Sequence, residues 1–257
     1  SIKEGKKKRK APAPFTTDTL LQAASSSLGW SMGKTSKIAS DLYQAGHITY
    51  IRTDSTRTSE TSRNEVKSFI KEKYGEEFLG PGSLGPDAKK DSSNVQDAHE
   101  AIRPTNPASE EVSGMEADHK RLYRLVWSRF TSSQMSDSIR ERRDLRATIE
   151  GSGLLMTGTA SWLIHSGWEE ASAEFLAQPR KSQPNFDLSE GSEWPLDKDE
   201  DNPLLTSDET KPPRRFSESS IVKQMKNAGI GRPSTYVSIV QRIQDRGYVE
   251  NENSSLV

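Results

Sequence analysis

The sequence predicts an α+β protein of several domains, with a helical part on either side of a β-rich part. Apolar residues recur at helical spacing between residues 15 and 137, alternate with a period near two from residue 138, and return to helical spacing after residue 214. A chain of 257 residues is long enough for two or three modest domains. We therefore expect several small hydrophobic cores.

The predicted domain boundaries follow these changes of pattern. Residues 1–14 are expected to be a basic lead-in linker, because their lysines and an Ala-Pro-Ala-Pro run leave almost nothing apolar to bury. A mainly helical domain is predicted over 15–137, and a β-rich segment over 138–213 that contains an acidic insert at 187–209. Residues 214–257 are predicted to be a helix-turn-helix-like DNA-binding segment that resembles a winged helix.

The helical domain begins with two predicted helices. The first starts at Thr17 or Asp18, either of which is a suitable cap, and buries Leu20 and Leu21. The second is expected over 35–46, because apolar residues lie one turn apart and a glycine ends the run.

Further elements follow in the same domain. The alternation over 48–52 predicts a short strand, with Asp54 beginning a turn. Apolar spacing predicts a third helix over 66–74 and a fourth over 122–130. Residues 80–91 are rich in Gly, Pro and Lys, which is typical of a loop.

The last two segments differ in period. Leu145 and Trp162 belong to alternating runs that predict strands. Ser217 is expected to cap one helix and Ser234 a second, with a glycine-rich turn between the two helices. A strand is expected to start at Tyr248.

Charge is unevenly distributed, although the net charge is only −1. Residues 1–50 contain eight Lys or Arg and three acidic residues, and residues 211–246 contain eight Lys or Arg and two acidic residues. Residues 187–209 contain nine acidic residues and one lysine. Because basic faces bind polyanions, the pattern favours a nucleic-acid partner.

Several classes of site are excluded by composition. The chain has no cysteine, and its four histidines lack metal-ligand spacing, so the sequence predicts no disulfide and no metal site. No apolar run is long enough to cross a bilayer and no export signal opens the chain, so we expect a cytoplasmic protein without a membrane partner. The opening serine and linker-like composition suggest a piece of a longer protein.

Three motifs carry the predicted chemistry, and the first is ITYIRTDS at 48–55. A tyrosine hydroxyl has a pKa of about 10, so it needs nearby positive charge to become a nucleophile. On the predicted strand Arg52 projects from the same face as Tyr50, and a guanidinium can hold two oxygens of one phosphate. Tyr50 and Arg52 are therefore the predicted catalytic residues. Asp54 is expected to orient Arg52 or to form the turn.

The second motif is AHEAIRPT at 98–105. His99 is expected to contact a phosphate or relay a proton, with a purely structural role as the alternative. Arg103 precedes a proline, which holds it extended. Its guanidinium either points into a DNA-binding groove or forms an ordinary ion pair.

The third motif is GIGRPST at 229–235. Backbone amides and the hydroxyls of Ser234 and Thr235 at a helix start are typical of a phosphate-binding nest, and Arg232 adds positive charge. A plain N-cap is the alternative for Ser234, and both roles are compatible.

In this order, the three motifs resemble those of type IA DNA topoisomerases, and Glu100 and Arg103 favour the bacterial topoisomerase I branch. The resemblance implies an ATP-independent enzyme that cleaves one DNA strand through a 5′-phosphotyrosine bond at Tyr50, passes the other strand and reseals the break. This reaction relaxes negative supercoils. The β-rich segment is then expected to be a hinged arch.

The resemblance also implies parts outside this chain. Mg²⁺ and an essential glutamate are expected in a separate Toprim domain, because nothing in this sequence matches that domain. Residues 197–201 are interpreted as a solvated acidic loop. The expected partners are single-stranded or underwound DNA and the Toprim domain, with the enzyme associated with the nucleoid. By itself, the chain is expected to bind single-stranded DNA without relaxing supercoils.

Two alternatives remain. One is a non-enzymatic winged-helix DNA-binding protein in which Tyr50 is only structural. The other is the core of a reverse gyrase, which joins a helicase to similar motifs, although this chain has no Walker-type phosphate loop.

Overall fold

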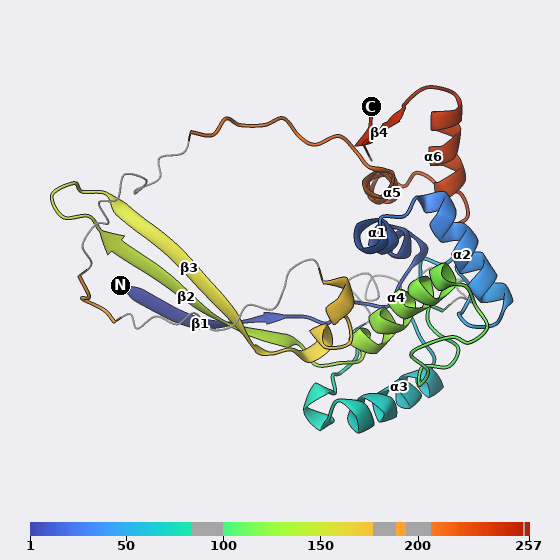
Figure 1. Ribbon diagram of the computed structural model, residues 1–257, viewed down its shortest axis with the longest axis horizontal. Coiled ribbons are helices and arrows are strands. Elements are labelled where there is room, and N and C mark those ends of the chain that lie inside the picture. The colour runs from blue at the N-terminus through green and yellow to red at the C-terminus, as the bar shows by residue number, and fades with distance from the viewer. Residues whose placement is uncertain (84–99, 177–188, 194–206, 254) are drawn as a thin grey trace.

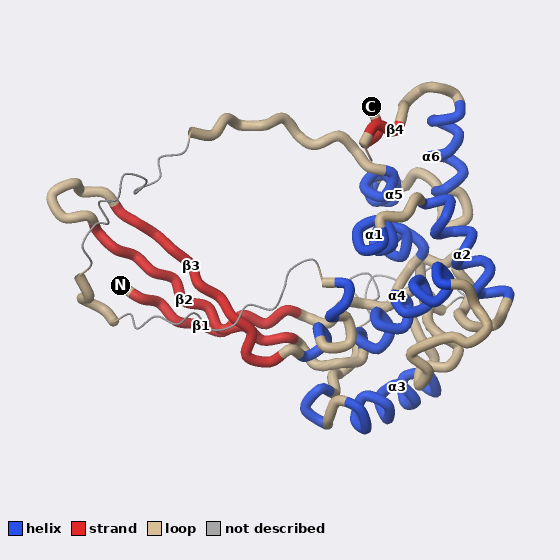
Figure 2. The backbone as a smooth tube through the Cα atoms, viewed as in Figure 1, coloured by secondary structure: helices blue, strands red, loops and turns tan. Residues whose placement is uncertain are grey.

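The computed structural model describes residues 1–83, 100–176, 189–193, 207–253 and 255–257. Figure 1 shows the helices gathered in one body, from which a long three-stranded sheet extends. Figure 2 shows the same division between the helices and the strands. Helices and an antiparallel sheet in separate parts of the molecule agree with the α+β class predicted from the sequence.

Four helices enclose the larger hydrophobic core. They are α1 (Thr17–Leu28), α2 (Met32–Gln44), α3 (Glu60–Lys73) and α4 (Ala117–Ser133). Helix α4 has the broadest buried face, with Leu122, Val126, Trp127 and Phe130 fully enclosed. Helices at all four predicted positions are confirmed. Helix α2 starts earlier than expected, because the Ser31 hydroxyl accepts a hydrogen bond from the Lys34 amide at 3.3 Å.

The sheet is antiparallel, with strand order β1-β2-β3. Its strands are β1 (Ile2–Arg9), β2 (Ser138–Thr148) and β3 (Leu155–His165). The expected linker over 1–14 is corrected here, because β1 pairs along the length of β2, from Ile2 opposite Leu145 to Arg9 opposite Ser138. Most β1 side chains are exposed, so backbone pairing forms this strand without the apolar burial that a sequence pattern reveals.

Short 3-10 helices connect the sheet to the helical body. They are η1 (Glu76–Phe78), η3 (Gly167–Glu169) and η4 (Ala173–Phe175). Trp168 in η3 is buried, and its indole nitrogen donates to the Arg9 carbonyl at 3.1 Å. The Ser132 hydroxyl of α4 donates to the Trp168 carbonyl at 2.9 Å. Trp168 therefore joins β1 to α4 at the base of the sheet.

A second, smaller core holds the C-terminal elements against α1 and α2. These elements are α5 (Glu218–Asn227), α6 (Tyr236–Asp245), β4 (Asn251–Glu252) and β5 (Ser255–Leu256). The core consists of Leu21, Met32, Val222, Met225, Tyr236, Val240 and Leu256. Since Leu21 and Met32 belong to the first two helices, the C-terminal segment shares its core with the helical body.

The sequence predicted the caps of these last helices only in part. Ser217 caps α5 as expected, and its hydroxyl accepts from the Ser220 amide at 3.2 Å. The N-cap of α6 is Thr235 and not Ser234. Strand β4 begins at Asn251, later than the predicted start at Tyr248.

Candidate active site

Tyr50 lies in the loop that follows α2. Gly46, with a φ of 76°, turns the chain out of α2 into this loop. The His47 amide donates to the Leu42 carbonyl at 2.9 Å and closes the end of the helix. The Tyr50 side chain is exposed, and its ring stands edge-on to that of Tyr43 with 5.4 Å between centroids. The helix end thus supports one side of the Tyr50 ring.

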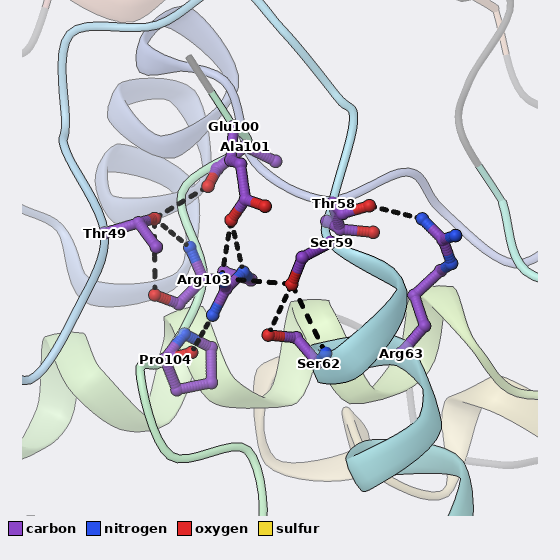
Figure 3. Close-up of polar contacts among 9 residues, drawn as sticks. All are labelled: Thr49, Thr58, Ser59, Ser62, Arg63, Glu100, Ala101, Arg103 and Pro104. Atoms are coloured by element: carbon purple, nitrogen blue, oxygen red, sulfur yellow. Dashed lines mark hydrogen bonds and ion pairs between the residues drawn. The ribbon is translucent and has the colours of Figure 1, made fainter. Parts of the chain in front are cut away.

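Backbone contacts hold this loop beside the second motif (Figure 3). The Thr49 amide donates to the Arg103 carbonyl at 2.9 Å, and the Arg103 amide donates to the Thr49 hydroxyl at 3.0 Å. That hydroxyl also donates to the Ala101 carbonyl at 2.7 Å. Motifs that lie about 50 residues apart in the sequence are therefore adjacent in space.

The predicted strand over 48–52 is wrong. The described pairing there is an isolated bridge between Ile48 and Pro104. Beyond Tyr50 the backbone is bound instead by the start of α1, where the Thr17 hydroxyl donates to the carbonyls of Ile51 at 2.7 Å and Thr53 at 3.0 Å. The segment is irregular but anchored.

Arg52 and Asp54 both have exposed side chains. The expectation that Arg52 shares a face with Tyr50 rested on strand alternation, which this loop lacks. Within the described part of the chain, no hydrogen bond or ion pair joins Arg52 to Asp54. Hydroxyls bind the turn amides instead: the Ser55 amide donates to the Thr53 hydroxyl at 3.0 Å.

Arg103 is held inside the protein by three neighbours (Figure 3). Its Nε and Nη2 donate to Oε2 of Glu100 at 2.9 and 2.5 Å, and Nη1 donates to the Pro104 carbonyl at 3.0 Å. A longer contact of 3.5 Å joins Nη2 to the Ser59 hydroxyl, which caps α3. The side chain is only 11% exposed. Of the two roles left open by the sequence, these contacts correspond to the ion pair.

His99 precedes Glu100 in the second motif but lies outside the described residues. The acidic stretch at 197–201 and most of the predicted loop over 80–91 also lie outside them.

The third motif forms a compact turn before α6. The Arg232 amide donates to the Thr235 hydroxyl at 2.8 Å, and the Thr235 amide donates to the Arg232 carbonyl at 2.8 Å. Nη1 of Arg232 donates to the Gly231 carbonyl at 2.7 Å. Both Arg232 and Ser234 are exposed. Gly231 has a φ of 78°, which favours glycine at this position.

Tyr236, which directly follows the third motif, was not among the predicted site residues. Charged groups from the first and third motifs both act on its hydroxyl. Burial raises the pKa of the Tyr236 hydroxyl, and the negative charges of Asp18 and Asp54 raise this pKa further. Asp18 also accepts a hydrogen bond from Lys226 Nζ at 2.9 Å. These residues lie where α1, the loop after Tyr50 and the third motif meet. The helical spacing of Tyr236 and Val240 is the signal that could have indicated a buried face, but the sequence cannot show what that face contacts.

Across the described ranges, no group of three or more His, Asp or Glu residues is placed to hold a metal ion. No helix in those ranges combines the length and the apolar character needed to span a membrane.

A comparison with known protein families shows which family the chain belongs to. Residues 1–257 match a family described as DNA topoisomerase. The chain belongs to the DNA topoisomerase family. The resemblance seen in the three motifs is therefore confirmed.

The chain is also similar to individual DNA topoisomerases. The chain is 41% identical over 247 residues to DNA topoisomerase 1 of Escherichia coli, and 39% identical over 259 residues to that of Thermotoga maritima. These alignments cover 95% of this chain in each case, but 27% and 38% of the relatives. The structure is similar to that of full-length topoisomerase I from Thermotoga maritima, with a TM-score of 0.79, 33% identity, and coverage of all of this chain and 42% of that one.

In this DNA topoisomerase chain, Tyr50 is exposed on an anchored loop. Arg52 in the first motif and Arg232 in the third are also exposed. A phenolic oxygen can attack phosphorus, and guanidinium groups can bind phosphate oxygens. These residue types are thus suited to chemistry on a phosphodiester.

Proposed function

We propose that this chain is the tyrosine-bearing part of a type IA DNA topoisomerase of the bacterial topoisomerase I branch, and that Tyr50 is its nucleophile. The observation that carries the proposal is that Tyr50 is exposed on a loop fixed on both sides, at the first of three family motifs. The chain covers about a quarter of its Escherichia coli relative, so the activity of a complete enzyme is part of the proposal.

The proposed step exchanges one ester for another. The Tyr50 hydroxyl oxygen attacks a DNA phosphorus, forming a phosphotyrosine bond to the 5′ end as the bond from phosphorus to the 3′ oxygen breaks. The tyrosine loses a proton and the leaving 3′ oxygen gains one. Because the phosphotyrosine ester conserves the energy of the phosphodiester, the reverse step reseals the strand without ATP.

Arginine and hydroxyl side chains bind the DNA phosphates in the proposal. Arg52 binds the attacked phosphate and stabilises the charge that develops on it. Arg232, Ser234 and Thr235 bind a neighbouring phosphate at the start of α6. We retain Asp54 and His99 as DNA-binding residues in this proposal.

Of the two roles that the sequence left open for Arg103, the proposal takes the ion pair. Its buried contacts with Glu100 and Ser59 support a role in fixing the second motif against α3, next to the loop of Tyr50.

Mg²⁺ does not fit the described part of this chain, because no carboxylate cluster suitable for a metal occurs there. We infer that its ligands and an essential glutamate lie in a Toprim domain, so no step above depends on the ion. The DNA partner is single-stranded or underwound DNA, and the enzyme works at the nucleoid. Without the Toprim domain, the chain binds single-stranded DNA but does not relax supercoils.

A covalent-adduct assay tests the proposal. The chain, supplied with its Toprim domain and Mg²⁺, is incubated with a single-stranded oligonucleotide labelled at its 3′ end and then denatured. The label should remain on the protein, because the tyrosine holds the 5′ end of the labelled fragment. Tyr50→Phe should abolish the adduct and leave DNA binding within about twofold. Tyr248→Phe, which removes another exposed phenolic hydroxyl, should leave the adduct unchanged.

A wild-type protein that binds the oligonucleotide but forms no adduct would refute the proposal and favour a non-enzymatic DNA-binding protein. An adduct that survives in Tyr50→Phe would assign the nucleophile to another residue.

A further inference from the structure

Tyr50 and Arg52 lie in a segment without regular secondary structure, so neither a helix nor a strand fixes their backbone. A nucleophile must nevertheless reach phosphorus within a few tenths of an ångström, since a misplacement of about 1 Å costs on the order of a hundredfold in rate. Something else in the structure must hold these residues in place.

The first candidate is Thr17, at the start of α1. Its hydroxyl lies 2.7 Å from the Ile51 carbonyl, 3.0 Å from the Thr53 carbonyl and 2.9 Å from the Thr53 amide. The Thr17 amide also donates to the Thr53 carbonyl at 2.9 Å. The backbone is therefore held immediately before and immediately after Arg52 by a single residue.

The second candidate is Thr49, immediately before Tyr50 (Figure 3). Its hydroxyl donates to the Ala101 carbonyl and accepts from the Arg103 amide, while its own amide donates to the Arg103 carbonyl. Because the Arg103 side chain is itself fixed by Glu100, the second motif forms a rigid support for the residue before Tyr50.

We propose that Thr17 and Thr49 are positioning residues that hold the Tyr50–Arg52 segment in the geometry needed for attack on DNA, an inference that rests on the proposed function. Each hydroxyl both donates and accepts. That of Thr17 shares its single hydrogen between the Ile51 and Thr53 carbonyls and accepts from the Thr53 amide. That of Thr49 donates to the Ala101 carbonyl and accepts from the Arg103 amide. Only serine shares both abilities on a side chain of similar size. Valine matches the shape of threonine but would remove these partners from the Ile51 carbonyl and the Thr53 amide at position 17, and from the Ala101 carbonyl and the Arg103 amide at position 49.

The test measures cleavage and binding separately in the protein supplied with its Toprim domain. The rate of adduct formation is measured at saturating single-stranded DNA, and the affinity is measured without cleavage. Thr17→Val and Thr49→Val should each slow adduct formation by about tenfold or more. The affinity for DNA should change by less than about threefold, because neither hydroxyl is proposed to contact DNA. Thr17→Ser should restore most of the rate.

Thr35→Val is the matched control. The Thr35 hydroxyl is buried in α2 and donates to the Ser31 carbonyl at 2.9 Å, so this variant loses the same chemical group away from Tyr50. It should lose less thermal stability than the other valine variants, because the Ser31 carbonyl keeps the Thr35 amide as a donor, and it should retain the wild-type rate. If one of the two positioning variants does not fold, the other tests the same proposal from the opposite side of the segment.

The inference is overturned if the valine variants cleave at the wild-type rate, if Thr17→Ser is as slow as Thr17→Val, or if Thr35→Val is equally slow. Failure of the proposed function itself would look different, because the wild-type protein would then form no adduct that Tyr50→Phe removes.

Discussion

Glu169 and Arg140 form a bidentate ion pair at the base of the sheet, with Nη1 to Oε1 at 2.6 Å and Nη2 to Oε2 at 2.7 Å. The Glu169 side chain is only 1% exposed. The Ser138 hydroxyl and the Arg9 guanidinium donate to the same carboxylate at 2.7 and 3.2 Å. Since these partners belong to β1 and β2, one carboxylate ties two strands to the part of the chain that packs on α4.

Glu169→Gln should destabilise the protein by roughly 2 to 4 kcal/mol, somewhat less than for a fully buried pair because Arg140 is 21% exposed. The variant leaves two guanidinium groups without a counter-charge. Urea unfolding at neutral pH measures the loss. Asp144→Asn, which removes the exposed partner of Arg142 farther along the sheet, should leave the free energy of unfolding unchanged. Equal losses in the two variants would contradict the anchoring role of Glu169.

Acid should remove the same stabilisation. Burial raises the pKa of Glu169, but hydrogen bonds from Arg140 and Ser138 and the charges of Arg140 and Arg9 outweigh burial and lower the pKa below 4.5. A depressed folded-state pKa stabilises the folded protein above the unfolded value, and this stability is lost as the pH falls through the folded value. Between pH 7 and the acid range, Glu169→Gln should therefore lose less stability than wild type. A parallel loss would show that this carboxylate does not govern the acid response.

The sequence was most informative where burial follows a period. The spacing from Leu122 to Phe130 predicted α4 correctly, because a helix inside a core must be apolar along a continuous face. It was least informative for β1, whose lysines face solvent although its backbone pairs with β2. The loop around Tyr50 shows a third case. Its alternation resembled that of a strand, but its backbone partners come from Thr17 and from residues 101–103, contacts that local patterns do not reveal.

The candidate site was predictable only in its composition. Three motifs identified the residue types, but the contact of Arg103 with Ser59 depends on the packing of α3 against the second motif. The proximity of Asp54 to Tyr236 likewise depends on the second hydrophobic core.

Arg103→Lys should separate structural support from DNA contact. Lysine keeps the charge but cannot reproduce the guanidinium contacts with Glu100 and the Pro104 carbonyl, so stability should fall by about 1 to 3 kcal/mol. The affinity for DNA should not change, because the side chain is 11% exposed and engaged within the protein. Urea unfolding and a binding titration at fixed salt measure the two effects. A loss of affinity with unchanged stability would place Arg103 on the DNA instead, because lysine keeps the charge but not the paired contacts of a guanidinium.

Arg232→Met should weaken the salt dependence of DNA binding without destabilising the fold. Arg232 is exposed, and its contacts with the Gly231 and Gly229 carbonyls are confined to its own turn, so truncation should leave the stability of the fold almost unchanged. If its guanidinium neutralises one phosphate, the slope of log affinity against log salt should fall in magnitude by about 0.7 for single-stranded DNA. Arg246→Met removes an exposed arginine at the end of α6, outside the third motif, and should leave the slope unchanged. Equal reductions in both variants would mean that DNA senses the total charge of this segment, whereas a reduction in Arg232→Met alone would support a defined phosphate site at the start of α6.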